Sequence, residues 1–122
     1  MPTYNQGNYL GEAIDSVLKQ TWTDFELIIV NDGSTDETVN VLHDYSNRYP
    51  EIRVIHQENR KLPGALNTGF QAARGEFLTW TSSDNRMLPQ MIETLLASLL
   101  KRPDAGMVFS DWNLIREDGE PF

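Results

Sequence analysis

Phe25 to Val30 (FELIIV) form an almost continuous apolar run, followed at once by Asn31-Asp32-Gly33-Ser34. A short apolar run that ends in turn residues is typical of a strand buried on both faces of a sheet. Such strands belong to parallel sheets, whose two faces are covered by helices. The sequence therefore predicts a central strand at 25–30 that opens at its carboxyl end into a polar turn.

Three further runs rich in β-branched and aromatic residues recur at intervals of about 24 to 30 residues, the length of a strand-helix-strand unit. They are Ile52–His56, Glu76–Thr81 and Gly106–Ser110. Apolar residues at helical spacing lie before and between the runs, at 9–19, 34–45, 63–73 and 91–101. This alternation predicts an α/β domain with a mainly parallel sheet and helices on both faces.

Local signals predict where the helices begin. Asn8 is expected to cap the first helix, and Ser34-Thr35-Asp36-Glu37 has the spacing of a capping box for the second. Pro89 suits the first turn of the fourth. The chain opens directly on turn-like residues and ends just after Asp118-Gly119-Glu120, a hairpin-turn pattern, so we expect an incomplete fold that lacks an opening strand.

The composition limits the classes of protein and of ligand to consider. The 122 residues, 39% hydrophobic and 23% charged, predict one domain spanning 1–122, and no apolar run approaches the roughly 20 residues that span a bilayer. The absence of cysteine excludes thiolate chemistry and favours a cytoplasmic protein. The net charge of -8 argues against nucleic acid as a partner, and a phosphate-bearing ligand would need a divalent cation.

Three loops are expected to meet at one edge of the sheet, where the carboxyl ends of parallel strands lie. They are residues 2–5, 31–34 and 82–85. Tyr4 offers an aromatic face, Asp32 an acceptor for a base N–H, and Asp84 a carboxylate for a cation. Together these are the parts of a nucleoside diphosphate site, although each residue alone is also explained as a turn, cap or helix-covering residue.

The remaining candidates are weaker. His43 and His56 have no partner at useful spacing, so we interpret both as structural. Arg60 and Lys61 lie in a loop on the same side of the sheet, either facing phosphates or solvated. Asp111 after the fourth run is either a turn residue or a further cleft residue.

Motifs in the same order as in one known family run through almost the whole chain. They are Pro2-Thr3-Tyr4-Asn5, Val17 to Thr21, Asn31 to Asp36, Asn59-Arg60-Lys61, Ala65 to Gly69, Gly75-Glu76 and Ser82-Ser83-Asp84. As a set they resemble the nucleotide-sugar-binding half of glycosyltransferase family 2, the inverting GT-A enzymes. The resemblance implies a GT-A fold whose acceptor-side half is absent here.

The resemblance also implies roles for individual residues. Thr3 and Tyr4 would flank the base, Asp32 would accept a hydrogen bond from it, and Ser82 or Ser83 would lie near the ribose. Asp84, the last acid of an Asp-x-Asp motif, would bind Mg²⁺ or Mn²⁺ between the two phosphates.

The implied activity is inverting transfer of a hexosyl group from a nucleoside diphosphate sugar, with a UDP-sugar favoured, to a saccharide or lipid hydroxyl. Cell wall or polysaccharide synthesis and a location in the cytoplasm, or peripheral at the inner face of the membrane, would fit. The general base is expected beyond Phe122, so these residues alone would bind donor without catalysing transfer. Neither the acceptor nor the oligomeric state follows from the sequence.

Three departures from the family pattern stand out. Ser82 replaces the first acid of Asp-x-Asp, Leu66 replaces an Arg, and Arg60 and Lys61 replace two glycines. The loss of an acid leaves open a pseudoenzyme or structural domain with a degraded metal site. A second alternative, a phosphoacceptor receiver domain, lacks the expected Lys after the fourth run.

Overall fold

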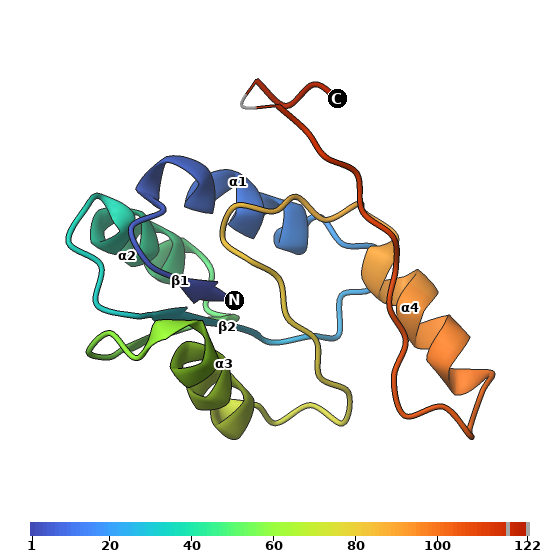
Figure 1. Cartoon of the computed structure of the whole chain (residues 1–122). Coiled ribbons are helices and arrows are strands. Elements are labelled where there is room, and N and C mark those ends of the chain that lie inside the picture. Colours follow the sequence, from blue (N-terminus) through green and yellow to red (C-terminus); the bar gives the residue numbers. More distant parts are fainter. Residues whose placement is uncertain (117, 122) are drawn as a thin grey trace.

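The computed structural model describes residues 1–116 and 118–121. Its strands and helices alternate over the first half of the chain, and a fourth helix follows (Figure 1). The elements are β1 (Pro2–Thr3), α1 (Gly7–Leu18), β2 (Leu27–Asn31), α2 (Thr38–Arg48), β3 (Ile52–His56), α3 (Lys61–Ala72) and α4 (Met91–Leu100).

The three strands form one parallel sheet in the order β1-β2-β3. Pro2 pairs with Val30 on one side of β2, and Leu27 pairs with Ile52 on the other. The expectation that the opening strand is lacking is therefore wrong, since Pro2 and Thr3 form a short strand, β1. All five residues of β2 are buried. The prediction of a central strand buried on both faces is therefore confirmed, with its start at Leu27 rather than Phe25.

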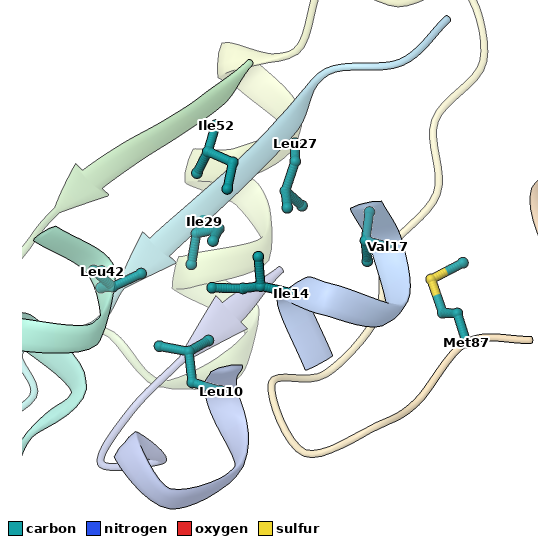
Figure 2. Close-up of a cluster of buried hydrophobic side chains, with 8 residues drawn as sticks. All are labelled: Leu10, Ile14, Val17, Leu27, Ile29, Leu42, Ile52 and Met87. Carbon is teal, nitrogen blue, oxygen red and sulfur yellow. The ribbon is translucent and has the colours of Figure 1, made fainter. Parts of the chain in front are cut away.

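Side chains of β2 alternate between two helical layers, because successive residues of a strand point to opposite faces. Leu27 and Ile29 pack with α1, α2 and β3 in the larger cluster, shown in Figure 2. Ile28 and Val30 pack on the other face against Ala65 of α3. Helices therefore cover both faces as predicted, and each fully buried Leu, Ile or Val contributes roughly 1.5–3 kcal/mol through burial.

The strands predicted at 76–81 and 106–110 are wrong, since neither segment forms a strand in the described structure. Ser82 and Asp84, which follow the first segment, line a cleft with Thr3 of β1, so this segment approaches the β1 edge. However, β1 has only two residues, and Pro2 has no N–H to donate, so β1 offers residues 76–81 few backbone groups for a ladder. The second segment leaves Phe109 81% exposed. A β-favouring composition does not form a strand without a partner ladder.

Helix starts also differ from the prediction. Gln6, rather than Asn8, precedes the first turn of α1. The helix α2 begins at Thr38, whose N–H donates to Asp36 Oδ1 at 3.1 Å, so the predicted capping box at Ser34 is wrong. The Ser34 hydroxyl instead accepts from the backbone N–H of Asn5, 3.0 Å away. Contacts between loops therefore took precedence over the local capping signal.

The predicted hairpin turn near the carboxyl end is confirmed. Ile115 and Pro121 form an antiparallel bridge, and Arg116 N–H donates to Glu120 O at 2.7 Å. Gly119 lies at φ +87, a backbone conformation that favours glycine. Among the described residues, no helix has both the length and the apolar character required to cross a membrane.

Candidate functional site

A cleft of about 190 Å³ lies at the carboxyl ends of β1 and β2. All six residues predicted for the nucleotide and the metal line it, and they come from three loops. They are Thr3, Tyr4, Asp32, Ser82, Ser83 and Asp84. The sequence therefore predicted which residues lie together at this edge. The parallel order of β1 and β2 explains why the first two loops meet, whereas residues 82–84 reach the cleft from a segment that is not a strand.

Two of the three loops are held together by hydrogen bonds. Asp32 N–H donates to Thr3 O at 2.9 Å, which continues the β1–β2 ladder into the cleft. The Asn5 side chain accepts from Thr35 N–H at 2.8 Å through Oδ1. Asn5 itself has φ 51, a left-handed conformation that Asn tolerates better than most residues. These hydrogen bonds fix the loop at residues 2–5 relative to the loop at residues 31–34.

Asp32 provides a buried carboxylate, one oxygen of which already accepts two hydrogen bonds. The residue is 3% exposed, and its Oδ1 accepts from Gln57 Nε2 at 2.6 Å and from Arg60 N–H at 2.8 Å. No described residue donates to its Oδ2. Oδ2 is therefore an acceptor suited to a ligand N–H.

The turn after β2 depends on Asn31 and Gly33. The Asn31 side chain accepts from Ser34 N–H at 3.0 Å, and its Nδ2 lies 3.1 Å from His56 Nδ1. Gly33 has φ +80, and an added Cβ would lie 3.1 Å from Asn59 N. Asn31 thus shapes the turn through its side chain, and His56 contacts Asn31 from outside the cleft.

The first loop contributes an aromatic ring and a buried hydroxyl. Tyr4 is 48% exposed although it lines the cleft, so its ring is accessible for stacking. Thr3 is 3% exposed, and its Oγ1 has no hydrogen-bond partner among the described residues. A buried hydroxyl without a partner destabilises the empty protein, which fits a position completed by bound ligand or water.

Residues 82–85 form a turn, in which Asn85 N–H donates to Ser82 O at 3.3 Å. Ser83 is buried, whereas Asp84 is exposed at the cleft. No group of three or more His, Cys, Asp or Glu residues gathers to hold a metal in the described part of the chain. One carboxylate with neighbouring hydroxyls still fits Mg²⁺ or Mn²⁺, since such ions commonly take one or two carboxylates and complete their shell with ligand phosphates and water.

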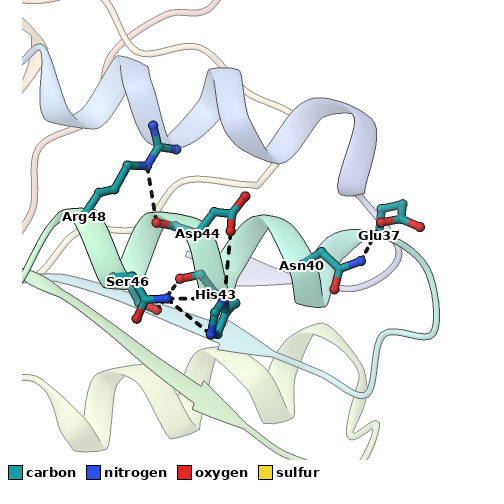
Figure 3. A network of polar contacts seen from close by, with 7 residues as sticks. Glu37, Asn40, His43, Asp44, Ser46 and Arg48 are labelled. Atoms are coloured by element: carbon teal, nitrogen blue, oxygen red, sulfur yellow. Dashed lines mark hydrogen bonds and ion pairs between the residues drawn. The ribbon is translucent and has the colours of Figure 1, made fainter.

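Other candidate residues do not line this cleft. The Arg60 side chain lies across Gly64 in the first turn of α3, a packing that a Cβ at position 64 would block. Lys61 and Asp111 are exposed, and neither lines the cleft. His43 lies on the exposed side of α2, as predicted, among polar contacts shown in Figure 3.

The cleft also contains residues that the sequence did not single out. Leu62 and Ala65, one helical turn apart on α3, form an apolar part of its lining together with Pro2. Their spacing was visible in the sequence, but it gave no sign of which face of α3 would meet β1. A second cleft of about 320 Å³ adjoins the first, and the two share Gln6 and Asp84.

Comparison with known sequences extends these observations. The model of a family described as "Glycosyl transferase family 2" matches residues 1–117. An uncharacterized glycosyltransferase, YibD of Escherichia coli K12, is 37% identical over 98% of this chain and 35% of its own length. Glycosyltransferase GlyG of Streptococcus pneumoniae is also 37% identical, over 98% of this chain and 40% of its own. The chain thus spans well under half the length of these relatives.

Solved structures show the same fold. TarS 1–349 of S. aureus in complex with UDP has a TM-score of 0.76 and 25% identity, covering 95% of this chain and 38% of that one. The mannosyltransferase PcManGT of Pyrobaculum calidifontis, in complex with GDP-Man and Mn²⁺, has a TM-score of 0.72 and 26% identity, covering 94% and 34%. With a GT-A arrangement of sheet and helices, and a family match that extends to residue 117, this chain belongs to glycosyl transferase family 2.

Proposed function

We propose that residues 1–122 are the donor-binding part of an inverting glycosyltransferase, which binds a nucleoside diphosphate sugar, with a UDP-sugar favoured, together with Mg²⁺ or Mn²⁺. One observation carries the proposal: the six residues expected to contact base, ribose and metal line a single cleft. Related structures in complex with UDP and with GDP-Man and Mn²⁺ support this ligand class.

In this proposal each loop meets a different part of the donor. The base stacks on Tyr4 and donates an N–H to Asp32 Oδ2, while Thr3 adds a polar contact beside it. Ser82 and Ser83 lie at the ribose. Asp84 would hold the cation, which would supply positive charge beside the diphosphate. The sugar then extends toward the second cleft, because that cleft adjoins the first at Asp84.

The chemistry follows from this placement. A bound cation would stabilise the negative charge that develops on the leaving diphosphate. The cleft residues hold the donor so that its anomeric carbon faces an acceptor hydroxyl for in-line attack. Deprotonation of that hydroxyl requires a general base, which we expect beyond Phe122. The proposed role of this part is therefore to bind and orient the donor in a cytoplasmic or membrane-peripheral enzyme of polysaccharide synthesis.

The sequence left two alternatives to a working donor site, and only one of them remains. The receiver domain is wrong, because the family match identifies a glycosyltransferase. A pseudoenzyme that retains the fold and has lost the metal site is favoured by one observation, the presence of Ser82 where the family has an acid. The donor-site hypothesis and the pseudoenzyme hypothesis differ in whether nucleotide binding depends on a divalent cation.

Titration calorimetry with UDP, in the presence and absence of Mn²⁺, tests the proposal. We expect heat of binding with Mn²⁺ and a loss of about tenfold or more in affinity when the metal is removed or when Asp84 is replaced by Ala. Asp111→Ala is the matched control, since Asp111 is an exposed loop carboxylate outside the cleft. Metal-independent binding would favour the pseudoenzyme. Absence of binding to UDP, GDP and TDP by folded protein would reject the donor site.

A further inference from the structure

A chain of side-chain hydrogen bonds lies behind the cleft and ends on Asp32. The Thr68 hydroxyl is 2.6 Å from Gln57 Oε1, and Gln57 Nε2 donates to Asp32 Oδ1, also at 2.6 Å. Thr68 comes from α3, and Gln57 follows β3 directly. Neither of these two residues lines the cleft. They therefore reach any ligand only through Asp32.

The direction of these bonds is fixed by the chemistry of the groups. An ionised carboxylate only accepts hydrogen bonds, so the Gln57 amide must turn its nitrogen toward Asp32. Its oxygen then needs a donor on the other side, which Thr68 supplies. The same hydroxyl lies 3.1 Å from Gly64 O, a longer contact, and it has one proton to donate. The Thr68 hydroxyl thus selects the amide orientation that Asp32 requires.

The result is a carboxylate with one oxygen committed to the protein. Gln57 and the Arg60 N–H both donate to Oδ1, which restricts rotation of the carboxylate group. The other oxygen, Oδ2, is left as an acceptor in a fixed position. Without Gln57 the carboxylate would be free to rotate and to turn either oxygen toward the backbone donor.

We propose that Gln57 and Thr68 are positioning residues that hold Asp32 as a fixed acceptor and so select nucleobases with a ring N–H. This inference rests on the proposed donor site. Uracil and guanine present such an N–H, whereas cytosine presents a ring nitrogen with a lone pair, which the carboxylate repels. A site built around a hydrogen bond discriminates strongly against a ligand that lacks the matching group.

Comparing the affinity for UDP with the affinity for CDP distinguishes an effect of Thr68 on the position of Asp32 from an effect on the stability of the whole protein. With Mn²⁺ present, we expect Thr68→Val to weaken UDP binding about tenfold and CDP binding by less than about twofold. Thr68→Ser retains the hydroxyl and should restore UDP binding. Ser98→Ala is the matched control, because Ser98 Oγ donates to Thr94 O in α4 and that bond resembles the helix contact of Thr68. Equal losses for UDP and CDP, or failure of Thr68→Ser to restore binding, would overturn the inference.

A double variant tests whether the effect passes through Asp32. Asp32→Asn should remove the preference for UDP by itself, and adding Thr68→Val should then cause less than about a twofold further loss. A full additional tenfold loss in the Asp32→Asn background would show that Thr68 acts by another route, and the inference would fail.

A measurement without ligand separates this inference from the donor-site proposal. Exchange of the Gln57 side-chain amide protons with solvent should be at least about tenfold slower than that of exposed Gln71, and Thr68→Val should abolish the difference. If the wild type binds no nucleotide, the donor site is rejected, and slow exchange would still support the hydrogen-bond chain. Fast exchange of Gln57 in the wild type would reject the chain, even if UDP binds.

Discussion

Residues 1–73 and 74–116 have similar local patterns and very different packing. The first region contains the sheet, three helices and nearly all of both core clusters. The second contains α4 and long segments outside any strand, and only Met87 joins the buried core from it. Its Leu78, Met107 and Phe109 are more than half exposed.

The difference shows what a β-favouring run needs in order to become a strand. FELIIV lies between two partners, β1 and β3, and two helical layers cover its faces. The runs at 76–81 and 106–110 have comparable composition but no ladder partner among the described residues. Strand propensity reflects packing against neighbours more than an intrinsic backbone preference.

The largest expected effect contrasts a core residue with an exposed residue of similar character. Ile29→Ala removes a side chain with 0% exposure at the centre of the sheet and should lower the free energy of unfolding by about 2–5 kcal/mol. Phe109→Ala should change it by less than about 0.5 kcal/mol. Urea denaturation measures both. A large loss for Phe109→Ala would mean that the second region is packed more tightly than its exposure indicates.

Gln20 connects the two regions, and its replacement tests how strongly they are coupled. The side chain is buried, donates from Nε2 to Leu88 O at 2.8 Å and accepts from Ile92 N–H at 3.0 Å. Gln20→Met leaves both backbone groups without this partner and should cost about 2 kcal/mol. Hydrogen exchange should accelerate mainly in residues 87–100. The control is Gln71→Met on the exposed side of α3, and uniform acceleration across the chain would contradict the coupling.

Asp36 stabilises the starts of two helices within the first region. Its carboxylate accepts from Gly7 N–H at 3.0 Å and from Thr38 N–H at 3.1 Å. Burial would raise the pKa of Asp36, but hydrogen bonds from the Thr38 side chain and from these backbone groups outweigh it and lower the pKa below its usual value. Asp36→Ala should cost about 1 kcal/mol at neutral pH.

Because its pKa is lowered, the contribution of Asp36 to stability depends on pH. A carboxyl whose pKa is lower in the folded state than in the unfolded state stabilises the folded protein. This stabilisation is complete above the pKa of the unfolded state, about 4, and it is lost as the pH falls through the pKa of the folded state. The difference in melting temperature between wild type and Asp36→Ala should therefore shrink on acidification below about pH 4. A difference that grows on acidification would contradict this assignment.

Tyr45 gives the smallest of the expected effects. Its hydroxyl donates to Asp15 Oδ1 at 2.8 Å and joins α2 to α1. Burial, followed by the Asp15 carboxylate, raises the pKa of Tyr45 to about 12. Tyr45→Phe should cost about 0.5 to 1 kcal/mol at neutral pH. Because the unfolded phenol ionises near pH 10, this contribution should disappear as the pH rises from about 10 toward 12, as absorbance titration and thermal melts can measure.

The sequence predicted the central strand and the cleft for the same reason. The buried character of Leu27 to Val30 identified a parallel sheet, and a parallel sheet places Thr3 and Asp32 at one edge. Asp84 lines the same cleft but follows a segment that is not a strand. Features set by contacts distant in sequence were not predictable. Gln57 and Thr68 carry no local signal of their link to Asp32, because the link forms only when α3 packs on the face of the sheet.

The start of α2 illustrates the same limit at short range. The Ser34 pattern suggested a capping box, but Asn5, 29 positions away, binds the hydroxyl that the box would have used. Likewise, the pattern at 76–81 contained no information on how short β1 is. Local signals were reliable where the tertiary contacts agree with them, and they failed where a distant residue competed.

Paramagnetic broadening by Mn²⁺ in the presence of UDP tests the central claim most directly. Mn²⁺ bound at Asp84 between the phosphates should broaden the amide resonances of residues 3–5 and 82–85 most strongly and spare those of α2, which does not line the cleft. Broadening should require UDP and disappear in Asp84→Ala. Broadening that is centred elsewhere, or that persists unchanged in Asp84→Ala, would contradict the proposed donor site.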